Sequence, residues 1–181
     1  MTARRSARPR SLALFLFLCL AVPAGLRAQS GPGWPPAMVG VRVGYLSRSA
    51  TNATVLGAQL HIPVLPSGHV ELVPNADITF FKGLKEYEYS VDAVFVSGGR
   101  RGGLVVGGGP AARNSIFPGS TTRETRKGWD VVAGLMFNPG EQLPVGIQIE
   151  ERWTFFRVPV SPRVLSIGVN IPLWGWGSSG R

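Results

Sequence analysis

The sequence predicts an all-β protein with eight antiparallel strands, and three observations lead to this fold class. Apolar and polar residues alternate with a period of two in successive segments from Val39 onward. Clusters of Gly, Pro, Ser and Asn separate these segments, as turns between strands require. No segment carries the apolar stripe at i, i+3, i+4 and i+7 that marks a surface helix. A chain of 181 residues has room for a single domain.

The first four expected strands, near residues 39–45, 56–64, 70–80 and 86–95, show the alternation most clearly. Their apolar faces carry Val39, Val41, Val43 and Tyr45; Leu56, Ala58, Leu60, Ile62 and Val64; Val70, Leu72, Ala76, Ile78 and Phe80; and Tyr87, Tyr89, Val91, Ala93 and Phe95. Their opposite faces carry glycine and polar residues, among them Arg42, Gln59, His61, Glu71, Asn75, Asp77, Glu86, Glu88 and Asp92.

The last four expected strands lie near residues 104–112, 128–137, 145–155 and 165–173. The apolar faces of the final three carry Trp129, Val131, Ala133, Leu135 and Phe137; Val145, Ile147, Ile149, Trp153 and Phe155; and Leu165, Ile167, Val169, Ile171 and Leu173. The segment 104–112 is apolar and rich in glycine, so its two faces cannot be told apart from the sequence. Its Gly107-Gly108-Gly109-Pro110 run is expected to allow close backbone approach to a neighbouring strand.

The first residues have the three parts of a secretory signal peptide. A basic segment with four arginines precedes the apolar run 11–22, which is too short for a comfortable transmembrane helix. Small residues follow, and Ala28 lies at the expected cleavage position. We therefore expect a signal peptide at 1–28, a short periplasmic lead at 29–37, a barrel at 38–174 and a tail at 175–181.

Loss of this signal would change the charge of the chain. Five of the 19 basic residues and none of the 10 acids lie within 1–28, so the net charge falls from +9 to +4. The remaining charge gives no support to nucleic-acid binding. The remaining chain also has no cysteine, so an exported protein of this sequence is not held together by disulfides.

The composition of the polar faces favours a membrane barrel over a soluble one. A soluble β-protein directs Lys, Glu and Thr to solvent, whereas these faces carry mainly Gly, Ser, Asn, Gln, His and isolated acids. Small residues suit the crowded lumen of an eight-stranded barrel. Aromatic residues lie near strand ends on the apolar faces, as two membrane interfaces require: Tyr45, Phe80, Tyr87, Trp129, Phe137, Trp153, Phe155 and Trp174. The sequence therefore predicts an eight-stranded antiparallel up-and-down transmembrane β-barrel.

The expected connections predict an orientation. Short periplasmic turns and longer external loops are typical of bacterial barrels. With an even strand number the first, third, fifth and seventh connections are external, and these include the longest expected connection, residues 113–127. The first is expected at 46–53 and the second, a short periplasmic turn, at 65–68.

The segments VGVRVGYLS, LVVGGGPAA, WDVVAGLMF and VLSIGVNIPLW resemble the glycine-punctuated strands of the small outer-membrane β-barrel proteins of the OmpA/OmpX type. The resemblance extends from Val39 to Trp174. It implies insertion by the barrel-assembly machinery into the outer membrane of a Gram-negative cell. Such proteins commonly end at an aromatic residue, whereas here Trp176 is followed by five more residues.

The charged residues of the polar faces are expected to form a network in the lumen, since buried charges must be paired or hydrated. The predicted network consists of Arg42, Gln59, Glu71, Asp77, Glu88, Asp92, Asp130, Glu150 and Arg152. An acidic, cation-selective channel is the alternative interpretation of the same residues. A metal site of His61, His69 and Glu71 is not favoured, because His69 lies at a turn. No catalytic motif is present, and no cofactor is expected.

Basic residues gather in or beside the expected external connections. Arg113, Arg123, Arg126 and Lys127 are the predicted rim that binds lipopolysaccharide, since guanidinium groups pair well with phosphate. The leading hypothesis is a monomeric structural or interaction protein of the outer membrane with no catalytic role. A small channel or carrier for a hydrophobic ligand is the second hypothesis, and a soluble periplasmic barrel of lipocalin type is the third.

Overall fold

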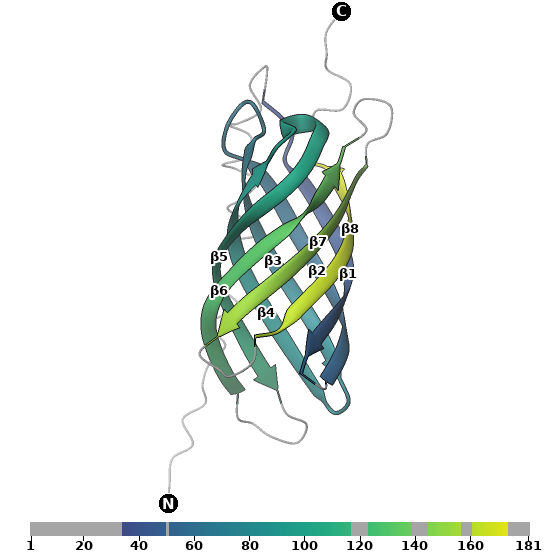
Figure 1. The fold of residues 1–181 in the computed structure, drawn as a ribbon, viewed down its shortest axis with the longest axis vertical. Coiled ribbons are helices and arrows are strands. Elements are labelled where there is room, and N and C mark those ends of the chain that lie inside the picture. The colour runs from purple at the N-terminus through teal and green to yellow at the C-terminus, as the bar shows by residue number, and fades with distance from the viewer. Residues whose placement is uncertain (1–33, 50, 117–122, 139–144, 157–160, 174–181) are drawn as a thin grey trace, which may run out of the picture. The chain divides into compact units, whose positions relative to one another are not determined.

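The computed structural model describes residues 34–49, 51–116, 123–138, 145–156 and 161–173, and eight strands close there into an antiparallel barrel (Figure 1). The strands are β1 (Met38–Arg48), β2 (Thr51–Pro63), β3 (Val70–Phe81), β4 (Leu84–Val96), β5 (Gly102–Ile116), β6 (Arg123–Phe137), β7 (Gly146–Phe156) and β8 (Arg163–Pro172). Each strand pairs with its neighbours in the chain, and β8 pairs with β1. The predicted fold class is confirmed.

A short 3-10 helix, η1 (Gly99–Arg101), connects β4 to β5. Over the described ranges, no helix is both long and apolar enough to cross a bilayer. The expected signal peptide, most of the lead, Trp174 and the tail lie outside the described residues, so those boundaries stay predictions.

The two faces of the sheet differ as the alternation predicts, because successive side chains of a strand point to opposite faces. On β1, Val41 is 66% exposed and its neighbour Arg42 is 5% exposed. The outward faces carry aliphatic and aromatic side chains, with Trp129, Leu135 and Phe137 each more than 60% exposed. The predicted facing is confirmed for the seven strands on which the sequence assigned one.

The glycine-rich strand β5 also alternates. Val105, Gly109 and Ala111 are buried in the lumen, whereas Leu104 and Val106 face outward. A Cβ atom on Gly109 would overlap the carbonyl oxygen of Val91 on β4. The glycine run therefore allows β5 to approach its neighbours closely, as the sequence predicts.

The connections do not have the predicted lengths. We call the end at which β1 begins and β8 ends the proximal end, and the opposite end, drawn lower in Figure 1, the distal end. The distal connections cover residues 49–50, 82–83, 117–122 and 157–162, and the proximal ones cover 64–69, 97–101 and 138–145. The expectation of longer connections at the distal end is wrong, because β1, β2, β5 and β6 all extend into segments that the sequence assigned to loops.

One part of the lumen, on the side of β3 to β6 near the proximal end, is apolar. Val73, Val94, Val96, Val105, Val132 and Met136 form one buried cluster there, against which Met38 packs. The sequence analysis treated the inward faces as polar and did not expect this layer. Not all charges of the lumen lie distal to this cluster, since Glu71 is the register partner of Val94.

Candidate functional site: the polar lumen and the distal rim

All nine residues predicted for the lumen network face inward and are at most 8% exposed. They come from six strands: Arg42 from β1, Gln59 from β2, Glu71 and Asp77 from β3, Glu88 and Asp92 from β4, Asp130 from β6, and Glu150 and Arg152 from β7. The structure brings seven of them into contact through Arg42 and Arg152. Of the other two, Glu88 pairs with Arg113 and Glu71 pairs with His61.

Arg42 holds the first ion-pair cluster. Its Nη2 lies 2.6 Å from Asp77 Oδ2, its Nε donates to Asp77 Oδ1 at 3.0 Å, and its Nη1 lies 2.5 Å from Glu150 Oε1. Nη1 also donates to Gln59 Oε1 at 3.1 Å. A Cβ on Gly57 would overlap the Asp77 carboxylate, so the glycine on β2 makes room for this pair. The cluster joins β1 to β3 and, across the lumen, to β7.

Arg152 holds the second cluster. Its Nη1 lies 2.7 Å from Asp130 and 2.8 Å from Asp92, and its Nη2 lies 3.4 Å from Glu150. The same Nη1 donates to Ser90 Oγ at 2.7 Å. Glu150 Oε1 therefore accepts from both arginines and connects the two clusters.

Arg113 forms a third cluster, in a place that contradicts its predicted role. The sequence analysis assigned Arg113 to an external loop, but it lies on β5 and is 3% exposed. Its guanidinium pairs with Glu88 and lies 3.4 Å from Glu86, and it stacks 4.7 Å from the Phe156 ring centroid. Inward facing at Gly109 and Ala111 continues to Arg113 with a period of two, so knowledge of the β5 register would have identified this residue.

Glu88 also links the third cluster to β7. Thr154 donates from Oγ1 to Glu88 Oε1 at 2.8 Å, and Thr154 is fully buried. Arg48 on β1 reaches Glu86 at 3.5 Å from the distal side. Glu86 was recognised as inward from the sequence but was not placed in the predicted network.

Neutral groups fill the lumen between β1, β2, β7 and β8. Gln59 Nε2 donates to Gln148 Oε1 and to Asn170 Oδ1, each at 2.9 Å. Gln148 Nε2 donates to Glu150 Oε2 at 2.7 Å, which joins the amides to the charged clusters. Asn170 Nδ2 also donates to Gln148 Oε1, at 3.2 Å.

The two histidines do not form a common site. His61 Nδ1 lies 2.7 Å from Glu71 Oε2 inside the lumen. His69 Nδ1 lies 2.8 Å from the carbonyl oxygen of Val96, and its ring stacks on Phe95. Within the described ranges, no group of three acidic, histidine or cysteine side chains has the arrangement of a metal site.

Two of the four bases predicted for the rim, Arg126 and Lys127, are exposed at the distal end, and Arg126 is paired with an acid. Arg126 Nε lies 2.8 Å from Glu124 Oε1, and both side chains are exposed. The Glu124 carboxylate, which accepts this hydrogen bond, offsets the charge of Arg126. Lys127 is exposed on the outer face of β6. Arg123 lies on β6, and its side chain is outside the described part of the chain.

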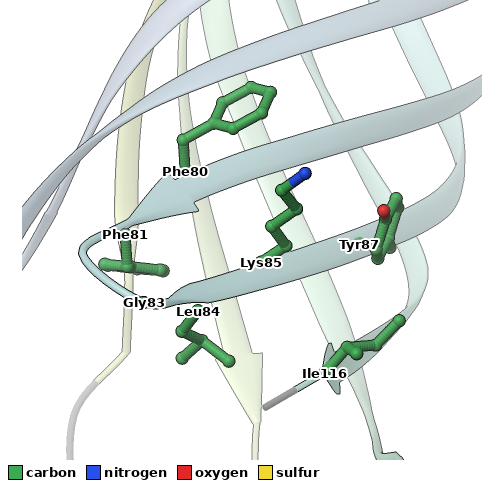
Figure 2. A pocket seen from close by; sticks show the side chains of 7 residues that line it. All are labelled: Phe80, Phe81, Gly83, Leu84, Lys85, Tyr87 and Ile116. Carbon is green, nitrogen blue, oxygen red and sulfur yellow. The ribbon is translucent and has the colours of Figure 1, made fainter. Parts of the chain in front are cut away.

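A groove of about 330 Å³ lies at the distal end of β3, β4 and β5 (Figure 2). Phe80, Lys85 and Ile116 form its outer row, because Lys85 is the register partner of both other residues. Phe81 and Leu84, which are also register partners, line it beside the turn at 82–83. The sequence analysis did not predict this groove, because its walls combine residues from both faces of the hairpin.

The chain is similar in fold to solved β-barrel structures. The N-terminal β-barrel domain of Pseudomonas aeruginosa OprF has a TM-score of 0.54 and 19% identity, over 74% of this chain and 97% of that one. Neisserial surface protein A has a TM-score of 0.55 and 13% identity, over 75% and 95%. Ail, the attachment invasion locus protein of Yersinia pestis, solved in complex with the heparin analogue sucrose octasulfate, has a TM-score of 0.51 and 15% identity, over 75% and 95%.

These comparisons define the class of protein by its fold. All three are eight-stranded outer-membrane barrels, and the predicted resemblance to small barrels of this kind is confirmed for the fold. No protein-family model matches the chain, and no curated protein matches it in sequence. At identities below 20% the likeness carries the architecture and no ligand or partner.

Proposed function

We propose that this protein is a structural or interaction protein of a Gram-negative outer membrane, with a lumen closed by its own side chains and no catalytic role. The observation that carries the proposal is the combination of a closed barrel, an apolar outer face and a charged, buried interior. Aliphatic residues such as Val41, Leu135 and Ile149 are half or more exposed on that outer face. Soluble monomers rarely expose apolar patches of more than a few hundred Å².

The soluble lipocalin-type alternative requires the reverse arrangement, an apolar lumen and a polar outer face. The three arginine clusters inside the barrel are inconsistent with an apolar lumen and therefore with this alternative. Export through the signal peptide and insertion by the barrel-assembly machinery are parts of the same proposal. Because β1 begins and β8 ends at the proximal end, the even strand number would place that end on the periplasmic side and the distal end outside the cell.

Extraction and gel mobility test the membrane role. The protein is expected to leave membrane fractions only with detergent and to show heat-modifiable gel mobility, as intact β-barrels typically do. A protein that is soluble without detergent and does not bind lipid would contradict the proposal.

A plugged lumen is the finer part of the proposal. Eight strands leave just enough interior for side chains, whereas aqueous porin channels use sixteen or more. Arg42 and Arg152 each contact at least two acids from other strands, which would fill the bore and hold it closed. Planar-bilayer recording should show no steady large conductance. Such a conductance from the unmutated protein would favour the cation-channel alternative.

Lipopolysaccharide is the proposed partner at the distal rim. Lys127 is exposed on the outer face there, and Arg163 pairs outward with Glu151. Lipid A phosphates would pair with such bases. Arg113 drops out of the proposed rim, because it is buried.

Neutralisation of Arg126 and Lys127 tests this partner. The double Gln variant should bind lipopolysaccharide more weakly than the unmutated protein at low salt, and the difference should shrink as salt screens the charges. Arg101 at the proximal end offers the control for general charge loss. Equal affinities of the double variant and the unmutated protein at low salt would remove the rim from the proposal.

A further inference from the structure

We propose that the distal groove of β3, β4 and β5 binds one acyl chain of a membrane lipid whose headgroup carries an anionic phosphate, with Lys85 as its partner. The inference rests on the proposed membrane function and adds to it a lipid site with a defined position. It differs from the rim of Arg126 and Lys127, which lies on β6.

The shape of the groove fits a chain and not a compact polar ligand. Its volume of about 330 Å³ lies at the lower end of the range for ligand pockets. The lining extends from Tyr87 past Lys85 to the turn at Gly83 (Figure 2). No atom lies within 4 Å of the position that a Cβ on Gly83 would take, so the groove is open at the turn.

The walls are apolar and held in place. Phe80 and Ile116 are each about 40% exposed on the outer face, where a bilayer would contact them. Phe81 is fixed from the opposite side, since the Arg48 guanidinium lies 5.1 Å from its ring centroid. Arg48 is in turn paired with Glu86, so the inner wall is connected to the lumen network.

The charge of the groove selects the headgroup. Lys85 is its only ionisable lining residue apart from the Tyr87 phenol, and no acid lines it. Among the described residues no carboxylate pairs with Lys85, and Lys82 precedes it in the exposed turn. An ammonium at the edge of an apolar groove binds phosphate as a point charge, while the lysine stem packs against apolar surface.

The test uses the mature protein refolded in neutral maltoside micelles, with phosphatidylglycerol and phosphatidylcholine of identical acyl chains as probes. Native mass spectrometry measures the retention of each lipid. The unmutated protein should retain one phosphatidylglycerol in preference to phosphatidylcholine. Lys85→Gln should reduce that preference about fivefold, the effect of one basic side chain at a membrane surface.

Two further variants separate the charge from the shape. Ile116→Trp fills the groove and should reduce retention of both lipids. Arg101→Gln removes an exposed base from the opposite, proximal end of the barrel and should leave the preference unchanged. Retention by Lys85→Gln and Ile116→Trp equal to that of the unmutated protein would overturn the lipid site.

Heat-modifiable mobility of every variant reports the barrel itself. An unmutated protein that never shows it would contradict the membrane function. Normal mobility combined with no preference for phosphatidylglycerol in the unmutated protein would contradict only the groove.

Discussion

Replacement of Arg152 by methionine should destabilise the barrel strongly, because three carboxylates depend on this guanidinium. Asp130, Asp92 and Glu150 lie 2.7, 2.8 and 3.4 Å from its nitrogens, and Arg152 is 3% exposed. Removal of one partner from a buried ion pair costs about 3–5 kcal/mol, since the other charge is left uncompensated. Glu150 keeps Arg42 as a partner, whereas the described residues give Asp130 no second cation. We therefore expect a loss of about 3–5 kcal/mol in the free energy of unfolding.

Urea unfolding in lipid vesicles, followed by tryptophan fluorescence, measures this loss. The matched control is Arg126→Met, which also breaks an arginine–carboxylate pair, but an exposed one. Exposed pairs contribute about 0.2–1 kcal/mol, so the control should stay near the unmutated protein. A change of less than 1 kcal/mol for Arg152→Met, equal to that of the control, would refute the reasoning.

A second substitution checks the cause of the loss. Asp130→Asn combined with Arg152→Met removes one of the uncompensated carboxylates. The double variant should therefore be more stable than Arg152→Met alone, with a coupling of about 0.5–3 kcal/mol, as found for residues in one ion-pair network. Additive effects of the two changes would show that Asp130 does not depend on Arg152.

Two further predictions concern the outer face and the glycines of the lumen. Ile167→Arg places a charge on the outer face of β8. If that face contacts lipid, as proposed, the change should cost about 2–4 kcal/mol of unfolding free energy, whereas Asn52→Arg, outward at the distal end, should cost at most about 1 kcal/mol. Equal costs would show that depth in the bilayer has no influence. Gly57→Ala puts a Cβ into the Asp77 carboxylate and should cost about 1–3 kcal/mol in the same unfolding assay, whereas the outward Ala58→Val should not, and an unaffected Gly57→Ala would show that the Arg42 pair has room to move.

The sequence predicted the facing of seven strands because a period of two is a local property. Val41 and Arg42 are neighbours of opposite character, so the pattern alone assigns their faces. On β5 the glycines and small residues give both faces the same character, and the assignment needs the register with β4 and β6. For the same reason the sequence did not identify Arg113 as a lumen residue. Its inward position follows only when the alternation is continued from Ala111.

The partners in the lumen could not be predicted for a different reason. Arg42 and Glu150 are 108 residues apart, and they meet only because the barrel closes between β8 and β1, which leaves β8 as the one strand between β1 and β7 on that side. The sequence gives the inward charges but not their heights, which depend on the register of every pair of strands between them. The strand ends were misjudged because Arg123 and Lys127 look like loop residues, although they continue the ladder with Ile116 and Ala112.

The facing of a charged side chain and the identity of its ion-pair partner are constrained to different degrees, and the distribution of charge inside the barrel explains why. Facing decides whether a charge lies in the lumen or on the outer face, and under the proposed function a charge near the middle of the outer face is costly, so the alternation must be explicit there in the sequence. Pairing decides only which acid a given arginine meets, and Glu150 accepts from Arg42 and Arg152 alike. A network with shared carboxylates tolerates several arrangements of its members as long as the inward charges remain compensated. The local pattern therefore has to be strict, whereas the identity of each partner follows from closure of the barrel.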